Sequence, residues 1–155
     1  MIKTGQPAPD FTLPRDGGGT VTLSRFRGGP VVLYFYPKDD TTGCTAEALE
    51  FTAALPRFTA LGATVLGLSK DTVTRHDKFR DKHGLGVILL SDAEENVCET
   101  WGTWVEKRMY GRTFMGIERT TVLIDAQGRI NRIWNKVKVN GHAAEVLEAV
   151  RALSK

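Results

Sequence analysis

Apolar and polar positions follow two periods along the chain, and each period predicts its own kind of element. Runs of apolar, β-branched and aromatic residues predict buried strands. These runs lie at residues 31–36, 64–69, 87–90, 121–124 and 129–134. Apolar residues at helical spacing predict four helices. The helices follow Cys44, run from Asp71 or Thr72 to about Lys82, run from Ser91-Asp92 to Trp101, and follow Asn140.

Shorter features complete the pattern. Gly17-Gly18-Gly19 lies between two short strands and predicts an N-terminal β-hairpin, and residues 24–29 predict a helical turn. Residues 102–118 mix basic and aromatic side chains, and we predict no element there. Because strands alternate with helices, we expect an α/β fold in which helices flank a mixed central β-sheet, with the N-terminal β-hairpin beside it.

The composition limits the kinds of protein that the chain can be. With 155 residues, of which 41% are hydrophobic and 25% charged, we expect a single domain that spans residues 1–155. The net charge of +3 comes from bases scattered among acids, which argues against nucleic-acid binding. No apolar run approaches the roughly 20 residues of a membrane helix, and the first residues lack a secretory signal. Two cysteines without metal-type spacing fit a reducing compartment, so we expect a cytoplasmic protein that uses no membrane.

Cys44 is the strongest candidate for chemistry. It follows a buried strand that Pro37 ends, and with Ala48, Phe51 and Leu55 it forms one face of an amphipathic helix. The sulfur therefore lies in the first helical turn, where unpaired N–H groups and the helix dipole favour a thiolate. Taken alone, a cysteine is more often a small buried core residue. The neighbours of Cys44 favour a nucleophile instead.

These neighbours carry a family resemblance. Pro37, Thr41 and Cys44 form P-x-x-x-T-x-x-C, and the surrounding string YFYPKDDTTGCTAE resembles the active-site signature of the peroxiredoxins. It looks most like the bacterioferritin-comigratory, or PrxQ-type, subfamily, although Thr42 stands where that subfamily has proline. The resemblance includes DFTL, TVTLSRFRG and PVVLYFYP and covers nearly the whole chain. It implies a thioredoxin-like fold and a peroxidase that reduces hydrogen peroxide and organic hydroperoxides without a cofactor.

The resemblance also assigns the catalytic residues. It makes Cys44 the nucleophile that becomes sulfenic acid, Thr41 a hydrogen-bonding partner of the peroxide, and Pro37 a shield of the sulfur from water. Arg119, in the family-like string GIERTTVLID, matches the arginine that favours the thiolate and holds the peroxide. A guanidinium suits this role because it stays charged and presents several donors in one plane.

Two further positions support this site. Glu47 matches the acid of the family's G-C-T-x-E string, and the resemblance implies that it orients Arg119. The backbone N–H groups near Gly43 are expected to donate to the peroxide oxygens. Met109-Tyr110-Gly111 resembles another subfamily signature, whose role cannot be read from the sequence.

The second cysteine decides how the sulfenic acid is reduced. Many relatives carry a resolving cysteine five residues after the nucleophile, where this chain has Leu49. We interpret Cys98, the other cysteine, as a buried core residue. We therefore expect a one-cysteine cycle completed by an external thiol such as thioredoxin, glutaredoxin or glutathione. We expect a monomer, with a dimer as the alternative.

Other interpretations stay open. Cys98 could be the resolving residue of a two-cysteine cycle, or oxidation of Cys44 could be a switch in a redox sensor or chaperone. A thioredoxin-type oxidoreductase is disfavoured because Glu47 stands where C-x-x-C needs its second cysteine. The three histidines lack a third ligand at metal spacing, so we expect surface positions rather than a metal site. They are His76, His83 and His142.

Overall fold

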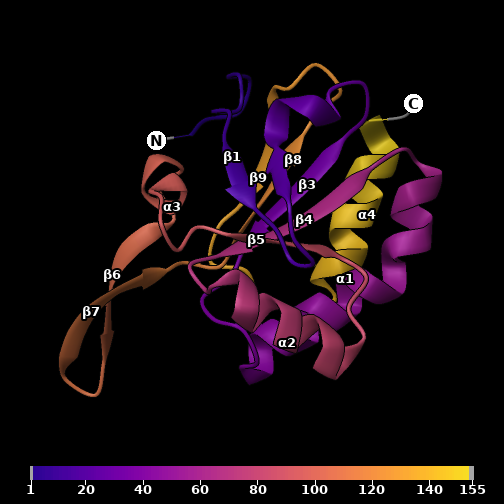
Figure 1. Ribbon diagram of the computed structural model, residues 1–155. Coiled ribbons are helices and arrows are strands. Elements are labelled where there is room, and N and C mark those ends of the chain that lie inside the picture. Colours follow the sequence, from indigo (N-terminus) through magenta and orange to yellow (C-terminus); the bar gives the residue numbers. More distant parts are fainter. Residues whose placement is uncertain (1, 154–155) are drawn as a thin grey trace.

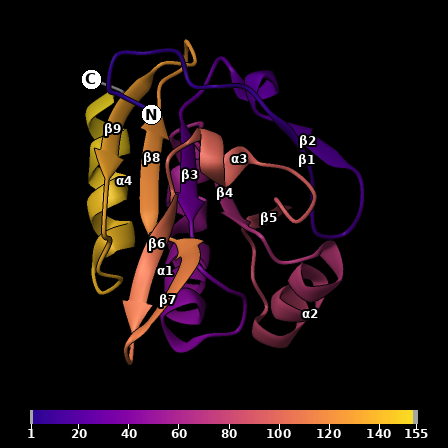
Figure 2. The same ribbon diagram turned by 90° about the vertical axis from the view of Figure 1, so that its left-hand side faces the viewer.

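A mixed five-stranded sheet forms the centre of the computed structural model, which describes residues 2–153 (Figures 1 and 2). Its strands, in spatial order, are β5 (Ile88–Ser91), β4 (Thr64–Ser69), β3 (Val31–Phe35), β8 (Thr120–Ile124) and β9 (Ile130–Trp134). The first three strands are parallel to one another, whereas β8 runs antiparallel to β3 and β9 antiparallel to β8. The predicted mixed sheet is therefore confirmed.

Every residue of β3 is buried, which shows that both faces of the sheet are covered at its centre. Val32 and Tyr34 point into one core, together with apolar residues from three helices. These are α1 (Thr42–Ala60), α2 (Val73–His83) and α4 (His142–Leu153). Leu33 and Phe35 point into a second core on the other face. That core is closed by the hairpin of β1 (Thr12–Pro14) and β2 (Thr20–Thr22), the 3₁₀ turn η1 (Leu23–Phe26) and α3 (Val97–Thr100).

Local signals begin and end α2 where the sequence predicts. The Thr72 side chain accepts a hydrogen bond from the Arg75 backbone N–H at 3.2 Å, and Gly84 ends the helix in the left-handed conformation. The N-terminal hairpin and the inward face of α4 also match their predictions. No helix within residues 2–153 is long and apolar enough to cross a membrane.

The Tyr34 ring packs closely between α1, the helix that contains Cys44, and the centre of the sheet. The Tyr34 ring stacks on Phe51 with centroids 4.7 Å apart. It also covers Gly67, its register partner on β4, where an added Cβ would lie 2.7 Å from the ring. Gly67 has no positive φ to explain it, so the glycine is there for the space that Tyr34 occupies.

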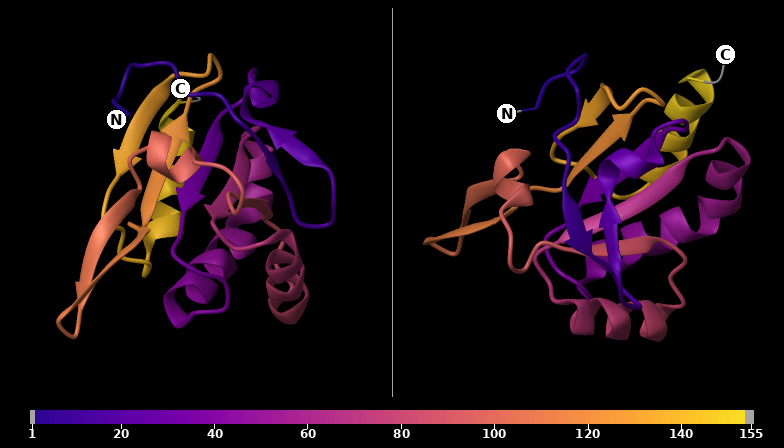
Figure 3. Two further views of the ribbon diagram at one scale, coloured as in Figure 1. Left: turned by 60° about the vertical axis from the view of Figure 1, so that its left-hand side comes forward. Right: turned by 45° about the horizontal axis from the view of Figure 1, so that its top comes forward.

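Two regions differ from the prediction. Residues 102–118, for which we predicted no element, contain the antiparallel hairpin of β6 (Trp104–Met109) and β7 (Arg112–Ile117). This hairpin projects away from the body of the molecule (Figures 1 and 3). The predicted helix from Ser91-Asp92 to Trp101 is wrong in its start, because α3 begins only at Val97. The Asp92 carboxylate folds back to accept hydrogen bonds from the backbone N–H groups of Val97 and Cys98, so Asp92 caps α3 from outside the helix.

Candidate active site

The junction between β3 and α1 positions the predicted nucleophile. Cys44 is the third residue of α1 and is buried, whereas Thr41, just before the helix, is exposed. The Thr41 hydroxyl does not cap the helix but donates to the Lys38 carbonyl at 2.9 Å. The first backbone N–H groups of α1 therefore have no side-chain cap. They lie at the N-terminal end of the helix, where Cys44 also lies. Pro37 lies half-buried in the same loop.

The register of the sheet brings Arg119 to this junction. Phe35, the last residue of β3, pairs with Thr120, the first residue of β8. Arg119, just before β8, therefore lies beside the end of β3 from which the loop to Cys44 starts. Its Nη2 donates to Cys44 Sγ at 3.3 Å, and its Nη1 donates to Glu47 Oε1 at 2.5 Å. One guanidinium thus binds the sulfur and the carboxylate with two different nitrogens.

Gly43 makes room for this contact. A Cβ at position 43 would lie 3.2 Å from Arg119 Nη2, closer than most side-chain contacts. The backbone of Gly43 has no positive φ, so its conformation does not demand glycine. Gly43 is therefore best explained by the close approach of the guanidinium.

Glu47 lies one helical turn beyond Cys44 and is almost fully buried. Burial raises the pKa of Glu47 from 4.5 to about 7, although the charge and hydrogen bond of Arg119 oppose the shift. Its Oε2 has no hydrogen-bond partner within the described residues. Burial alone would lower the pKa of Arg119, but the charges of Glu47 and Cys44 outweigh it and the pKa is raised. The cation is thus fixed in its charged form.

A buried ion pair anchors the loop that carries Thr41. The Asp39 carboxylate accepts a hydrogen bond from Tyr36 Oη at 2.6 Å and contacts His76 Nδ1 at 2.6 Å. His76 Nε2 lies 2.8 Å from the Leu90 carbonyl. Both ring nitrogens face groups that can accept, an arrangement that stabilises the doubly protonated, cationic imidazole. In agreement, Asp39 outweighs the opposing effect of burial and raises the pKa of His76.

The surface positions expected for the histidines are wrong in two of three cases. His76 is fully buried because α2 turns that face onto the Asp39 loop. His142 is also buried, and its Nε2 is hydrogen-bonded to Thr121 Oγ1 at 2.8 Å. His83 stays partly exposed beside the Asp40 carboxylate, at 2.8 Å.

One cluster has metal-type side chains. Potential ligand atoms of Asp39, Asp71 and His76 lie within 4.8 Å of one another. Hydrogen bonds already account for all three: Asp71 Oδ2 accepts from the Asp39 backbone N–H and from Ser69 Oγ, and His76 is paired with Asp39. The cluster is therefore explained as an internal hydrogen-bond network.

Cys98 lies apart from the site. It is fully buried, as expected, but in the core on the sheet face opposite to that of Cys44. Burial and the neighbouring Asp92 carboxylate raise the pKa of the Cys98 thiol far above its usual range. Both cysteines are free thiols.

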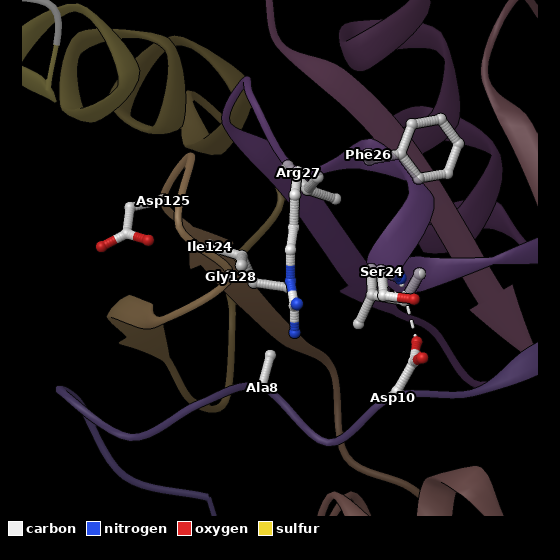
Figure 4. A pocket seen from close by; sticks show the side chains of 10 residues that line it. Ala8, Asp10, Ser24, Phe26, Arg27, Ile124, Asp125 and Gly128 are labelled. Atoms are coloured by element: carbon white, nitrogen blue, oxygen red, sulfur yellow. Dashed lines mark hydrogen bonds between the residues drawn. The ribbon is translucent and has the colours of Figure 1, made fainter.

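A small hollow near the N-terminal segment is also distinct from the site. It lies at the Ile124 end of β8, whereas Arg119 precedes the other end (Figure 4). The Arg27 side chain runs through it, and an added Cβ on Gly128 would lie 2.8 Å from the Arg27 Nε. The Asp10 carboxylate there already accepts two backbone N–H groups. With about 20 Å³ of free space, the hollow has room for roughly one water.

Sequence reasoning missed two features around the site. One is the Asp39–His76 pair, which joins segments that are distant in sequence. The other is Lys107 on β6, whose stem crosses Gly116, where an added Cβ would lie 3.2 Å from it. Burial and the charge of Arg119 lower the pKa of Lys107. Alternation along β6 would have been the only signal for this position, and the basic residues obscure it.

Comparisons with known proteins agree on one family. The model of the AhpC/TSA family matches residues 4–133. Peroxiredoxin Bcp of Bacillus subtilis is 46% identical over 99% of this chain and 98% of its own, and peroxiredoxin Bcp of Escherichia coli is 40% identical over 94% of each.

Solved structures agree as well. Bacterioferritin comigratory protein of Xanthomonas campestris, described for its alkyl peroxide reduction, superposes with a TM-score of 0.91 at 43% identity, over 99% of this chain and all of that one. PrxQ of Xylella fastidiosa reaches a TM-score of 0.95 at 40% identity, over all of this chain and 99% of that one. These neighbours confirm the thioredoxin-like fold. The chain belongs to the AhpC/TSA family and, within it, to the peroxiredoxins of Bcp/PrxQ type, which are thiol-dependent peroxidases.

Proposed function

We propose that Cys44 attacks the peroxide as a thiolate and that Arg119 activates it. The sulfur forms a bond to one peroxide oxygen while the O–O bond breaks. The departing oxygen takes a proton and leaves as water or an alcohol, and Cys44 becomes a sulfenic acid. The observation that carries the proposal is the hydrogen bond from Arg119 Nη2 to Cys44 Sγ at 3.3 Å.

Arg119 has a second task in this proposal. Its donors lie where negative charge shifts from the sulfur to the departing oxygen, so the same cation stabilises the ground-state thiolate and the transition state. Glu47 holds the guanidinium from the other side, and Gly43 leaves room for it. A positioned cation needs little rearrangement during the reaction, which favours catalysis.

Thr41 is proposed to accept a hydrogen bond from the peroxide. Its hydroxyl hydrogen is already used, because it donates to the Lys38 carbonyl, and its lone pairs are free to accept. The uncapped N–H groups of Gly43 and Cys44 are proposed to donate to the peroxide oxygens. Pro37, half-buried in the loop, is proposed to keep bulk water from the sulfur.

The proposed cycle uses one cysteine. Cys98 belongs to the core on the far face of the sheet, and its raised pKa keeps it a thiol, which attacks poorly. A disulfide needs Cα atoms within roughly 7 Å, so joining Cys98 to Cys44 would require extensive unfolding. Thioredoxin, glutaredoxin or glutathione would therefore reduce the sulfenic acid directly.

The remaining expectations belong to the same proposal. The substrates are hydrogen peroxide and organic hydroperoxides, and residues 1–155 act as a single domain without a metal or cofactor. The protein acts as a monomer in the cytoplasm, where two free thiols persist most readily.

Peroxide consumption driven by dithiothreitol tests the chemistry. Wild type and Cys98→Ser should turn over many equivalents of peroxide, whereas Cys44→Ser should turn over none. If wild type oxidised by one equivalent of peroxide before dithiothreitol is added held a Cys44–Cys98 disulfide, the two-cysteine cycle would replace the proposal. If wild type stopped after one equivalent, Cys44 would be a sensor rather than a catalyst.

A further inference from the structure

The β6–β7 hairpin carries most of the large apolar side chains that are exposed within residues 2–153. Among residues 2–153, five large apolar side chains are exposed, and four of them lie on this hairpin. They are Met109, Tyr110, Phe114 and Met115; the fifth, Leu49, lies on α1 two residues after Glu47. The hairpin projects from the body, so these side chains have no core to enter (Figures 1 and 3).

Its tip holds a residue that the turn does not favour. Tyr110 has φ +54° and Gly111 has φ +75°, which is the two-residue turn that prefers asparagine and glycine. A bulky side chain with positive φ is strained, and the Tyr110 side chain is 96% exposed. Asparagine at this position would therefore stabilise the fold better than tyrosine does. The tyrosine is better explained by contact with another molecule.

The pairing register separates the two faces of the hairpin. Lys107 is opposite Phe114, and Met109 is opposite Arg112, so these four side chains share one face. Met109 is 57% exposed and Phe114 43% exposed. We call Lys107, Met109, Arg112 and Phe114, together with Tyr110 at the tip, the hairpin face. It combines apolar groups with two cations and carries no acidic residue.

This face is close to the site along the chain, because β7 ends at Ile117, only two residues before Arg119. The alternate face begins with Trp104 and Ile117, which pack into the core. The hairpin face, in contrast, stays exposed, a short way along the chain from Arg119.

We propose that the hairpin face is the docking surface for a protein dithiol reductant whose own thiol is surrounded by apolar and acidic residues. The inference rests on the proposed one-cysteine function: without a resolving cysteine, the reductant must come to Cys44 itself. Tyrosine and arginine are the side chains that most often dominate binding energy in protein interfaces, and the cations steer an acidic partner. A small thiol needs no such surface.

Steady-state reduction by thioredoxin, recycled by thioredoxin reductase and NADPH, tests the proposal, with glutaredoxin as a second reductant. The variants are Tyr110→Asn, which suits the turn, and Arg112→Glu. Arg108→Glu is the matched control, because Arg108 is an exposed arginine on the opposite face of the same hairpin. Peroxide oxidation and dithiothreitol-driven turnover are measured for each variant.

We expect Tyr110→Asn and Arg112→Glu to raise the KM for the protein reductant about tenfold, which corresponds to loss of one interface anchor. Arg112→Glu should also weaken the salt dependence of this KM. Arg108→Glu should leave the KM within about twofold, and oxidation and dithiothreitol turnover should be unchanged throughout.

Three results would overturn the docking surface. They are an unchanged KM in both variants, an equal rise in Arg108→Glu, and a wild type that dithiothreitol reduces but neither protein does. If sedimentation showed that Tyr110→Asn dissociates a dimer, the face would instead bind a second copy of the chain. Failure of the proposed function itself is distinguishable, because Cys44 would then either stay unoxidised by peroxide or form a disulfide with Cys98 in every variant.

Discussion

Replacing Arg119 by methionine removes the cation that donates to Cys44 Sγ and keeps a side chain of similar length. At the observed 3.3 Å and an effective dielectric constant near 20, Coulomb's law sets an upper limit of about 5 kcal/mol on the thiolate–guanidinium attraction. Desolvation reduces this value, and a hydrogen bond to a charged group contributes about 1.5–3 kcal/mol in practice. Because about 1.4 kcal/mol is a factor of ten in rate, the second-order rate constant with peroxide should fall about 10- to 150-fold.

The assay is stopped-flow oxidation by hydrogen peroxide at neutral pH. Arg119→Met also leaves Glu47 buried without its partner, so unfolding by urea is measured beside the rate. Arg119→Lys serves as the matched control: it keeps the charge but cannot bridge Cys44 and Glu47 with two nitrogens, and its rate should lie between wild type and Arg119→Met. A rate for folded Arg119→Met within threefold of wild type would refute the activation by Arg119.

Three further predictions follow from single contacts. Between pH 4.5 and about 7, Glu47 keeps its proton in the folded protein but loses it in the unfolded chain. The free energy of unfolding of the wild type should therefore fall as pH rises through this window, by up to about 3 kcal/mol. Glu47→Gln should lose that dependence, and parallel stability–pH curves for the two proteins would argue against it. Gly43→Ala places a Cβ 3.2 Å from Arg119 Nη2 and should slow peroxide oxidation roughly tenfold with no loss of stability, as stopped-flow and thermal melting would report. Gly67→Ala places a Cβ 2.7 Å from the Tyr34 ring and should cost about 1–3 kcal/mol in urea unfolding, so an unchanged midpoint would count against the close approach.

The parts of the fold that the sequence predicts are those specified by local pattern. The apolar run of β3 and the helical face of Cys44 and Phe51 are contiguous in the chain, so their periods are readable directly. The ends of α2 are marked by Thr72 and Gly84 for the same reason. Contact between Cys44 and Arg119 is different, because it depends on the register of β3 against β8, and only the family resemblance indicated it.

The unpredicted parts depend on partners that are distant in sequence or on exposure. The surface position predicted for His76 is wrong because His76 shares the buried face of α2 with Phe79, and its burial depends on the Asp39 carboxylate from another loop. The β6–β7 hairpin has apolar and basic side chains on both faces, since much of it is exposed, so no clean alternation marks its strands. Asp92 has the side chain of a helix cap, yet it caps α3 from five residues before the first helical residue, Val97, rather than from the position next to it.

The most direct test is the chemical state of Cys44 after a single turnover. Fully reduced protein receives one equivalent of peroxide and is then treated with dimedone. Its intact mass is measured by mass spectrometry under non-reducing conditions, together with those of Cys98→Ser and Cys44→Ser. We expect wild type and Cys98→Ser to gain one dimedone adduct on Cys44, and Cys44→Ser to gain none. A wild-type protein that loses two hydrogen atoms and gains no adduct, with the Cys98→Ser variant trapped instead, would show a Cys44–Cys98 disulfide and contradict the one-cysteine cycle.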